Sequence, residues 1–519
     1  MSCTLPPPEI IPSPESLVLT ERLPDSLKLT RATFGMVALL SAVLLVLSYQ
    51  PLYYTDLWGH LSYGKLIFET QALPDSEPFM PLAKGMPLVD SAWLSQLSLY
   101  ALEARFGLTA LQFLHAALCT ACFSLLAWRF CRTTRHVPAA VLGLAVFGGL
   151  NWFQLLVVRP QMAGMACFVG LLALLTSRSQ SRARWVAMPL LLALWANLHG
   201  SFVVGLAMLG CWCAGRAIDV WRRTGRLAAI RHDRLVRRLF LTTELAAAAV
   251  LLNPYGLRLY SHVLSFSANP NLADLVEWHP LQIRDVQGQA AALVALGLVF
   301  AYRLSPRRVS AIEVLSLLLF GGAALWTQRM LAWFAPVAAG CLVWNGLAAW
   351  QKLRGTGAAP ADSPRTGRWS LAVVALLWVV AASTPFGFTL LHGPKIEFRS
   401  ISPDTPIAAA EYLKKNPPRG LIFNTYEWGD YLLWAGPPGL QVFITSQAHL
   451  APPDVWRHYM SVINGGGKWD ETLDNYGVNT IVVDRQERAG FISRLKKDEA
   501  WKLAFEDSLA SIFVRKRGI

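Results

Sequence analysis

Residues that can carry out acid–base chemistry lie just after the first long apolar segment of the chain. Residues 53–60 read Tyr-Tyr-Thr-Asp-Leu-Trp-Gly-His and follow the apolar segment 33–49, which is long enough to cross a bilayer. Asp56 is therefore expected near the C-terminal end of a membrane helix, at the boundary with water. A carboxylate there can act as a general base or bind a cation. The alternative is a polar capping residue, although an acid is unfavourable at a helix C-terminus.

Two arginines fall in very short connections between apolar segments. Arg159 and Arg329 are permanent cations that such connections cannot carry far from the membrane, and charges at this depth usually mark a site. A guanidinium can hold a phosphate through two hydrogen bonds, and the alternative is binding of a lipid headgroup. The other candidate binding residues are His60, Gln161, His199 and Glu277.

Three of these residues keep more than one interpretation. His60 can orient a phosphate or bond a backbone carbonyl, and His199 can belong to a polar site or to a satisfied turn. Glu277 can be a second acid or an interfacial charge. Asp90, just before residues 92–103, is interpreted as a helix N-cap, whereas Glu427 and Asp430 are predicted to be solvated surface.

Composition identifies the kind of protein that carries these residues. The chain has 519 residues, of which 54% are hydrophobic and 15% are charged. Soluble domains carry about 25% charge, so the composition predicts a polytopic membrane protein. The net charge of +14 lies largely in short loops, which argues for membrane orientation rather than nucleic-acid binding. Most of the eight cysteines fall in or beside apolar segments, so no disulfide framework is predicted.

Apolar segments predict about eleven transmembrane helices. Five arginine-containing loops all fall on one side of this layout, and the positive-inside tendency makes that side cytoplasmic. The N-terminus is then cytoplasmic, and the segment 92–103 is a short interfacial or re-entrant helix. The predicted spans are 33–49, 109–128, 138–157, 161–176, 186–198, 201–217, 239–252, 290–302, 310–326, 331–349 and 370–391.

The sequence divides into three parts. Residues 1–32 are predicted to be a disordered cytoplasmic tail, and 33–392 a transmembrane domain with large outer loops at about 50–108 and 253–289. Residues 393–519 regain charge and predict a small extracytoplasmic α/β domain. Its predicted strands are 420–424, 441–445, 479–484 and 508–517, and its predicted helices are 405–415 and 490–497. No glycine-rich loop opens a helix after a strand, so nucleotide binding is not indicated.

Several short motifs together resemble the GT-C superfamily of integral-membrane glycosyltransferases, which use polyprenyl-phosphate sugars. That group includes the mannosyltransferase-like and lipopolysaccharide glycosyltransferase-like families, and the resemblance implies a bacterial-type inner or plasma membrane protein. The resemblance covers most of the chain. The matching stretches are 56–60, 64–67, 73–79, 93–94, 159–161, 195–200 and 277–278.

The resemblance implies transfer of a sugar, with inversion, from a polyprenyl-phosphate donor to an acceptor hydroxyl on the outer membrane face. Asp56, which matches the family's first-loop acid, would take the acceptor proton. The positions of Arg159, Arg329 and His199, rather than a family motif, suggest that they stabilise the leaving phosphate. The expected partners are the lipid-linked sugar, a glycan, lipid or protein acceptor, and the bilayer. No nucleic acid is expected.

One departure from the family pattern affects the metal prediction. Many relatives carry two nearby acids in the first loop, but Thr55 precedes Asp56 here. The sequence therefore predicts no obligatory metal or other cofactor. If a divalent cation binds, its second ligand would have to be Asp75, Glu77, Asp90 or Glu277.

Two other classes of function stay open at this point. A transporter or flippase for a lipid-linked or anionic substrate would also use buried arginines, although no internal repeat is visible. An inactive membrane scaffold with a partner-binding outer domain is the third interpretation.

Overall fold

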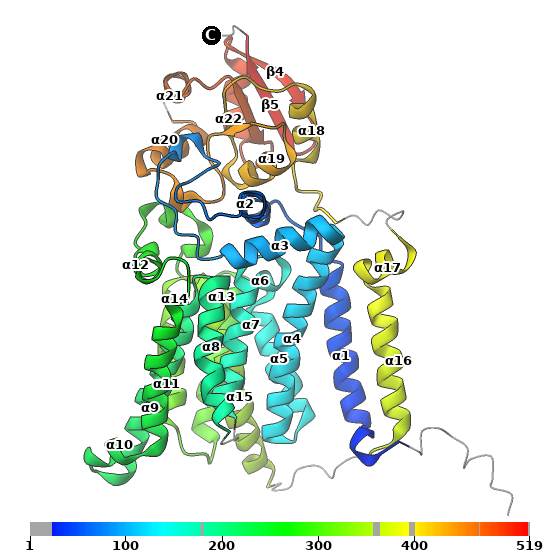
Figure 1. The fold of residues 1–519 in the computed structure, drawn as a ribbon, viewed down its shortest axis with the longest axis vertical. Helices are drawn as coiled ribbons and strands as arrows, with labels where there is room; N and C mark the ends of the chain where they lie inside the picture. The colour runs from blue at the N-terminus through cyan, green and yellow to red at the C-terminus, as the bar shows by residue number, and fades with distance from the viewer. Residues whose placement is uncertain (1–22, 178–180, 356–363, 394–399, 467, 517–519) are drawn as a thin grey trace, which may run out of the picture.

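The computed structural model describes residues 23–177, 181–355, 364–393, 400–466 and 468–516. It consists of a long helical bundle with a small β-sheet beyond one end, and helices α2 and α3 lie across the bundle between the two (Figure 1). Of the predicted N-terminal tail, residues 1–22 lie outside the described residues.

Each of the eleven predicted segments contains a helix. Among the described residues, five helices are long and apolar enough to cross a membrane, or six if the bent pair α16–α17 counts as one span. The count of eleven crossings therefore stays a prediction. The helices are α1 (Arg31–Ser48), α4 (Leu108–Thr134), α5 (Val137–Leu150), α7 (Gln161–Thr176), α8 (Arg182–Leu198), α9 (Phe202–Thr224), α11 (Arg234–Val250), α13 (Val286–Leu304), α14 (Ala311–Trp326), α15 (Leu331–Arg354) and α16 (Gly367–Ser383).

Two segments predicted to be continuous are broken. The segment 138–157 is divided at Asn151 into α5 and α6 (Trp152–Leu156). The segment 370–391 bends by 80° between α16 and α17 (Pro385–His392). Proline lacks the N–H that would continue the helix, and Thr384 caps the new helix by accepting a hydrogen bond from Gly387 N.

The outer surface of the bundle carries large exposed apolar side chains. Leu190 of α8, Leu245 of α11, Leu293 of α13 and Trp378 of α16 are each more than half exposed. A soluble protein rarely exposes so much contiguous apolar surface, whereas a bilayer solvates it. This surface and the long apolar helices are those of an integral membrane protein.

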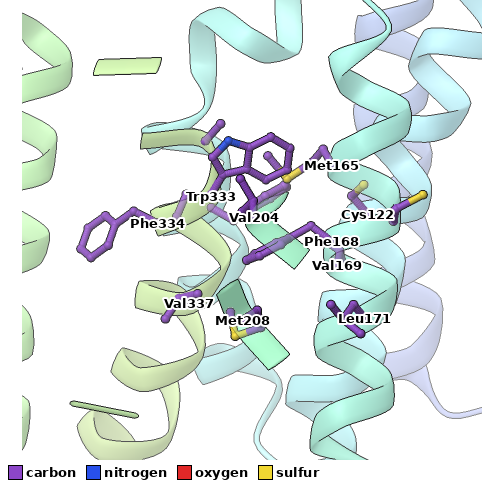
Figure 2. Close-up of a cluster of buried hydrophobic side chains, with 14 of the residues drawn as sticks. Cys122, Met165, Phe168, Val169, Leu171, Val204, Met208, Trp333, Phe334 and Val337 are labelled. Atoms are coloured by element: carbon purple, nitrogen blue, oxygen red, sulfur yellow. The ribbon is translucent and has the colours of Figure 1, made fainter. Parts of the chain in front are cut away.

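The interior of the bundle is packed around aromatic rings. Phe168 of α7 is fully buried and lies 5.5 Å from Trp333 of α15 and 5.6 Å from Phe320 of α14, between ring centroids. Figure 2 shows Phe168 and Met165 beside Cys122 of α4, with Trp333 on the neighbouring helix. The buried Cys122 is a free thiol, as the sequence predicted.

Two different kinds of structure occupy the ends of the bundle. The short helix α10 (Ala228–His232), from an arginine-rich loop, lies at the end away from the sheet (Figure 1). The other end carries α2 (Leu57–Thr70), α3 (Trp93–Phe106) and α12 (Leu257–Phe266). Helix α3 contains the segment predicted to be interfacial.

Short 3-10 helices lie at η3 (Asp25–Leu27), η4 (Pro81–Ala83), η5 (Pro270–Asp274), η6 (Val276–Trp278) and η7 (Gln328–Met330).

The C-terminal residues form a five-stranded mixed sheet in the order β2-β1-β3-β5-β4. The first three strands in this order are parallel, and β5 is antiparallel to both β3 and β4. The predicted strand 441–445 is shorter, and β4 was not predicted. The strands are β1 (Leu421–Asn424), β2 (Gln441–Val442), β3 (Thr480–Asp484), β4 (Trp501–Glu506) and β5 (Ala510–Arg515).

Helices surround this sheet, and one of them packs on a helix that lies between the sheet and the bundle. Helix α19 packs against α2, which carries the acidic motif that follows α1. Only α18 and α22 were predicted from the sequence. The elements are α18 (Ile407–Lys415), η8 (Tyr426–Trp428), α19 (Gly429–Ala435), η9 (Ala448–Leu450), α20 (Pro453–Ile463), α21 (Trp469–Asn475) and α22 (Ala489–Lys497).

Candidate active site between the bundle and the C-terminal sheet

Asp56 lies at the start of a helix rather than at the end of one. Helix α1 ends at Ser48, and the chain then runs in an extended path, with Leu52 paired to Ile401, before α2 begins at Leu57. The prediction that Asp56 ends the first helix is therefore wrong. The free N–H groups of a helix N-terminus favour a negative charge, so this position suits a carboxylate.

Four of the predicted site residues form a continuous chain of alternating charges. Arg159 donates from Nε to Oδ1 of Asp56 at 2.8 Å and from Nη1 to Oε2 of Glu277 at 2.9 Å. Arg329 donates from Nη1 to the other oxygen of Glu277 at 2.5 Å. Charge-assisted bonds of this kind are the strong ones, so the four side chains hold one another in place.

The ion pairs shift the pKa values of both acids downward. Burial raises the pKa of Asp56, but the charges of Arg159, His60 and Arg329 outweigh it, and the net pKa lies well below the usual value. Burial likewise raises the pKa of Glu277, and Arg329 and Arg159 reverse that effect. Both acids are thus carboxylates at any physiological pH.

His60 links Asp56 to a second buried carboxylate. The Nε2 atom of His60 lies 3.8 Å from Oδ2 of Asp56, one helical turn earlier in the chain. Its Nδ1 atom lies 3.2 Å from Nε2 of Gln96, which also donates to Oδ1 of Asp90 at 3.1 Å. The sequence analysis interpreted Asp90 as a helix N-cap and named it as a possible second metal ligand. The N-cap of α3 is instead Ala92, whose backbone N donates to Oδ1 of Asp90 at 3.0 Å, and Asp90 belongs to the site.

His199 is held as a neutral side chain beside this network. Its Nδ1 atom accepts a hydrogen bond from Ser201 N at 3.1 Å and lies 2.7 Å from Ser201 Oγ. Burial, assisted by the charge of Arg329, lowers the pKa of His199 to about 3. A neutral imidazole can donate from Nε2, but it adds no positive charge to the site.

All of the predicted site residues lie around one cavity of about 320 Å³. Asp56, His60, Arg159, Gln161, His199, Glu277 and Arg329 line it. A second cavity, of about 660 Å³, begins on the other side of the same wall. Its apolar surface comes from Phe153, Val157, Met162, Val276 and Val286, and polar residues such as Gln154, Arg284 and Asp285 also line it. Gln161, Arg159, Glu277 and Arg329 line both cavities.

The C-terminal sheet region also contributes to the first cavity. Tyr426, Glu427, Ser446, Gln447 and His449 line it, and none of them was predicted as a site residue. Glu427 is half-buried and its Oε2 atom is enclosed, so the prediction of solvated surface is wrong for this residue. This burial raises the pKa of Glu427 to about 7. The sequence offered no signal, because these residues reach the site only through the packing of the sheet region on α2.

Asp430 is a further correction. It is 1% exposed rather than part of a solvated surface, and its Oδ2 atom accepts hydrogen bonds from the backbone N and the hydroxyl of Ser446. Burial raises the pKa of Asp430 to about 7. Asp430 thus supports Ser446, which lines the cavity.

Glu77 is buried for a structural reason. It accepts hydrogen bonds from the hydroxyl of Tyr63 and from the backbone N atoms of Phe79 and Met80. These bonds fix the turn of the first long loop, and Glu77 lines neither cavity.

Within the described ranges, no group of three or more His, Cys, Asp or Glu side chains is placed to hold a metal ion. Asp56 and Glu277 both face the guanidinium of Arg159, which already supplies the positive charge between them. Metal dependence stays a prediction.

Solved structures share this architecture. The archaeal oligosaccharyltransferase AglB from Archaeoglobus fulgidus matches 88% of this chain and 69% of its own length, with 11% identity and a TM-score of 0.53. The arabinofuranosyltransferase AftD from mycobacteria matches 96% of this chain but 40% of its own length, with 16% identity and a TM-score of 0.51. Apo ArnT from Cupriavidus metallidurans matches 93% of this chain and 97% of its own length, with 13% identity and a TM-score of 0.50.

The resemblance that the sequence motifs suggested is confirmed at the level of the fold, which this chain shares with the oligosaccharyltransferase AglB and the arabinofuranosyltransferase AftD. The chain has a GT-C fold. No family model matches it, and no curated protein matches it.

Proposed function

We propose that this chain is a membrane glycosyltransferase that moves a sugar from a polyprenyl-phosphate donor to an acceptor hydroxyl, with inversion. The observation that carries the proposal is the chain Asp56–Arg159–Glu277–Arg329. All four residues line a polar cavity, and Arg159, Glu277 and Arg329 also line a second, more apolar one. A lipid-linked sugar has the same division of chemistry, since a charged phosphate joins a polar ring to an apolar chain.

The apolar cavity suits the donor lipid. Phe153 and Val286 line it and are more than half exposed, so they offer apolar surface to a polyprenyl chain. Arg159 and Arg329 also line it, and they would hold the phosphate. The structural neighbour AglB was solved with a dolichol-phosphate, a ligand of this class.

The polar cavity then holds the sugar and the acceptor. The acceptor oxygen attacks the anomeric carbon, the bond from that carbon to the phosphate oxygen breaks, and the phosphate leaves with the electron pair. Asp56 takes the acceptor proton, and the arginines stabilise the charge on the phosphate. His60, Gln161, His199 and Glu277 orient the groups around this reaction.

The ion pair of Asp56 with Arg159 explains how a weakly basic carboxylate can become a base. In the unliganded site Arg159 lowers the pKa of Asp56, so the carboxylate attracts a proton poorly. A phosphate that binds Arg159 draws the guanidinium away from Asp56. The basicity of Asp56 then rises at the moment when donor is bound.

The proposal includes the membrane topology that the sequence predicts. The chain crosses the membrane eleven times, the N-terminus is cytoplasmic, and residues 393–519 form an extracytoplasmic domain over the site. The position of α10 at the end of the bundle away from the sheet supports this orientation, because its loop is rich in arginine. The acceptor is a glycan, lipid or protein.

No metal or other cofactor is obligatory in this proposal. A divalent cation would have to replace Arg159 between Asp56 and Glu277, at a site that already holds a permanent positive charge. Activity that survives a chelator would agree with this, and loss of activity that Mg²⁺ or Mn²⁺ restores would contradict it.

The test is release of polyprenyl phosphate from polyprenyl-phosphate sugars by the full-length protein in detergent. Asp56→Asn is expected to lower turnover by about 10²–10⁴-fold. Glu69→Gln, which changes an exposed carboxylate on the same helix, is the matched control and should leave turnover unchanged. Normal turnover by Asp56→Asn would remove Asp56 as the base. Absence of turnover with every donor would favour a scaffold, or a transporter if liposomes moved the lipid.

A further inference from the structure

Three side-chain oxygen atoms of residues that line the polar cavity are buried without a hydrogen-bond partner. One is Oε2 of Glu427, and the other two belong to a hydrogen-bonded pair of side chains, Oδ2 of Asp90 and Oε1 of Gln96. Asp90 is 6% exposed and Gln96 is 4% exposed, and both residues line the cavity. Buried polar atoms are nearly always paired, so two orphaned acceptors in this pair point to a ligand that supplies donors.

The remaining hydrogen bonds fix which atoms are left free. Oδ1 of Asp90 accepts from Ala92 N at 3.0 Å and from Gln96 Nε2 at 3.1 Å. A flipped Gln96 amide would turn its oxygen toward the Asp90 carboxylate, which is repulsive, so the amide nitrogen must face Asp90. The same nitrogen lies 3.2 Å from Nδ1 of His60. The free atoms of the pair are therefore two acceptors.

Other residues that line the same cavity supply donors. Arg159 and Arg329 contribute guanidinium groups, which are paired with Asp56 and Glu277, and the indole Nε1 of Trp278 is a buried donor without a partner. A phosphate suits the two arginines. The free oxygens of Asp90 and Gln96 instead repel an anion and call for neutral groups that donate hydrogen bonds.

We propose that Asp90 and Gln96 bind hydroxyl groups of a sugar ring held in this cavity. The inference rests on the proposed function, and it assigns to that site two residues that determine which sugar is accepted. Adjacent ring hydroxyls are neutral donors, and an acid beside an amide oxygen accepts from two of them at once. The ring belongs either to the lipid-linked donor or to the acceptor.

Binding measurements on the full-length protein in detergent test the inference without relying on turnover. The probes are farnesyl phosphate and its esters with mannose, glucose, galactose and arabinofuranose, together with the methyl glycosides of the same sugars. The wild type is expected to bind one sugar ester more tightly than farnesyl phosphate, or to bind one methyl glycoside. The first result places the ring on the donor, and the second places it on the acceptor.

Asp90→Asn is the decisive variant, because Oδ1 of asparagine keeps both existing hydrogen bonds while a donor replaces the free acceptor. It is expected to weaken the sugar-dependent part of binding by about ten- to a hundredfold. Binding of farnesyl phosphate itself should stay unchanged, which also reports on folding. Gln96→Met, which loses the amide at similar volume, is the second variant and should act in the same direction. Glu69→Gln is the control.

The outcomes separate this inference from the proposed function. Sugar-dependent binding that both variants retain would overturn the inference and leave the donor proposal intact. Glycoside binding that depends on Asp90, without any binding of prenyl phosphates, would support the inference and overturn the donor class. Absence of binding by the wild type to every probe would overturn both.

Discussion

Gly59 of α2 lies directly against Asp430 of α19. A Cβ atom on residue 59 would be 2.5 Å from Oδ1 of Asp430, closer than real Cβ atoms approach a neighbour. Asp430 is held by its hydrogen bonds to Ser446 and cannot retreat freely. The missing side chain at residue 59 therefore sets how closely the sheet region packs on the helix that carries His60 and begins at Asp56.

Gly59→Ala is expected to loosen this contact and to lower both stability and sugar transfer. Overpacking of this kind typically costs about 1–3 kcal/mol. The melting temperature and turnover of the detergent-solubilised protein measure the two effects. Gly322→Ala is the control, because no atom lies within 4 Å of a Cβ at that helical position. Adding Asp430→Ala to Gly59→Ala should cost less than the sum of the two single changes; strict additivity would contradict the contact.

Arg159→Lys is expected to impair transfer although it keeps the positive charge. The guanidinium of Arg159 bonds Asp56 and Glu277 through two different nitrogens, and the single ammonium group of lysine cannot reproduce that bridge. We expect turnover to fall by about tenfold or more, which corresponds to loss of one charge-assisted bond.

The matched variant is Arg329→Lys. Arg329 makes one hydrogen bond to Glu277 and lies over the ring of Trp278, so lysine replaces more of its contacts. Its turnover should fall less than that of Arg159→Lys. The reverse order would show that bridging by Arg159 is not the important property.

Glu277→Gln is expected to tighten the binding of a prenyl phosphate without sugar. Glu277 accepts hydrogen bonds from Arg159 and Arg329 and so competes with a phosphate for both cations. Loss of its charge should lower the Kd of farnesyl phosphate several-fold, which a titration in detergent measures. Sugar transfer should fall at the same time, because Glu277 no longer orients the two arginines as well. A weaker or unchanged Kd would mean that the arginines do not receive the phosphate.

Asp90→Asn is expected to change the pH dependence of stability. Burial raises the pKa of Asp90 to about 6 from the ordinary value of 3.8. A folded-state pKa above the unfolded value means that folding is favoured most at low pH, and that this advantage is lost as the pH rises to about 6. The ionised carboxylate of Asp90 therefore destabilises the folded state by at most about 3 kcal/mol, the free energy that corresponds to this pKa shift.

The melting temperature of Asp90→Asn should therefore exceed that of the wild type at pH 8, and the difference should shrink at pH 4.5. Scans at a fixed rate in one detergent provide the comparison, with Glu69→Gln as the control. If Asp90→Asn instead lowered the melting temperature equally at both pH values, the ionised Asp90 carboxylate would not destabilise the folded wild type. Functional sites commonly retain residues that destabilise the fold, because those residues are needed to bind the ligand.

Periodicity and composition predicted much of the bundle. Long apolar segments leave few alternatives to helices, since every backbone polar group in a membrane must be paired within the chain. The same reasoning could not find the breaks at Asn151 and Pro385 in segments that are apolar throughout. In the C-terminal region the short strand β4 was missed, because its alternation is weak and half of its residues are partly exposed.

The residue types alone marked Asp56, Arg159, Glu277 and Arg329 as candidates, because a charge beside a membrane span is costly unless it is used. Only the tertiary structure decided that they touch. Asp56 and Arg159 are 103 residues apart, and Arg159 and Glu277 are 118 apart, so no local pattern links them.

The structure also decided what the remaining polar residues do. A sequence does not distinguish a carboxylate that faces solvent from one enclosed by packing, and this is why Glu427 and Asp430 were mistaken for surface. The same limit concealed the free oxygens of Asp90 and Gln96. Composition determined that the chain belongs in a membrane, and side-chain packing across distant segments determined where its chemistry lies.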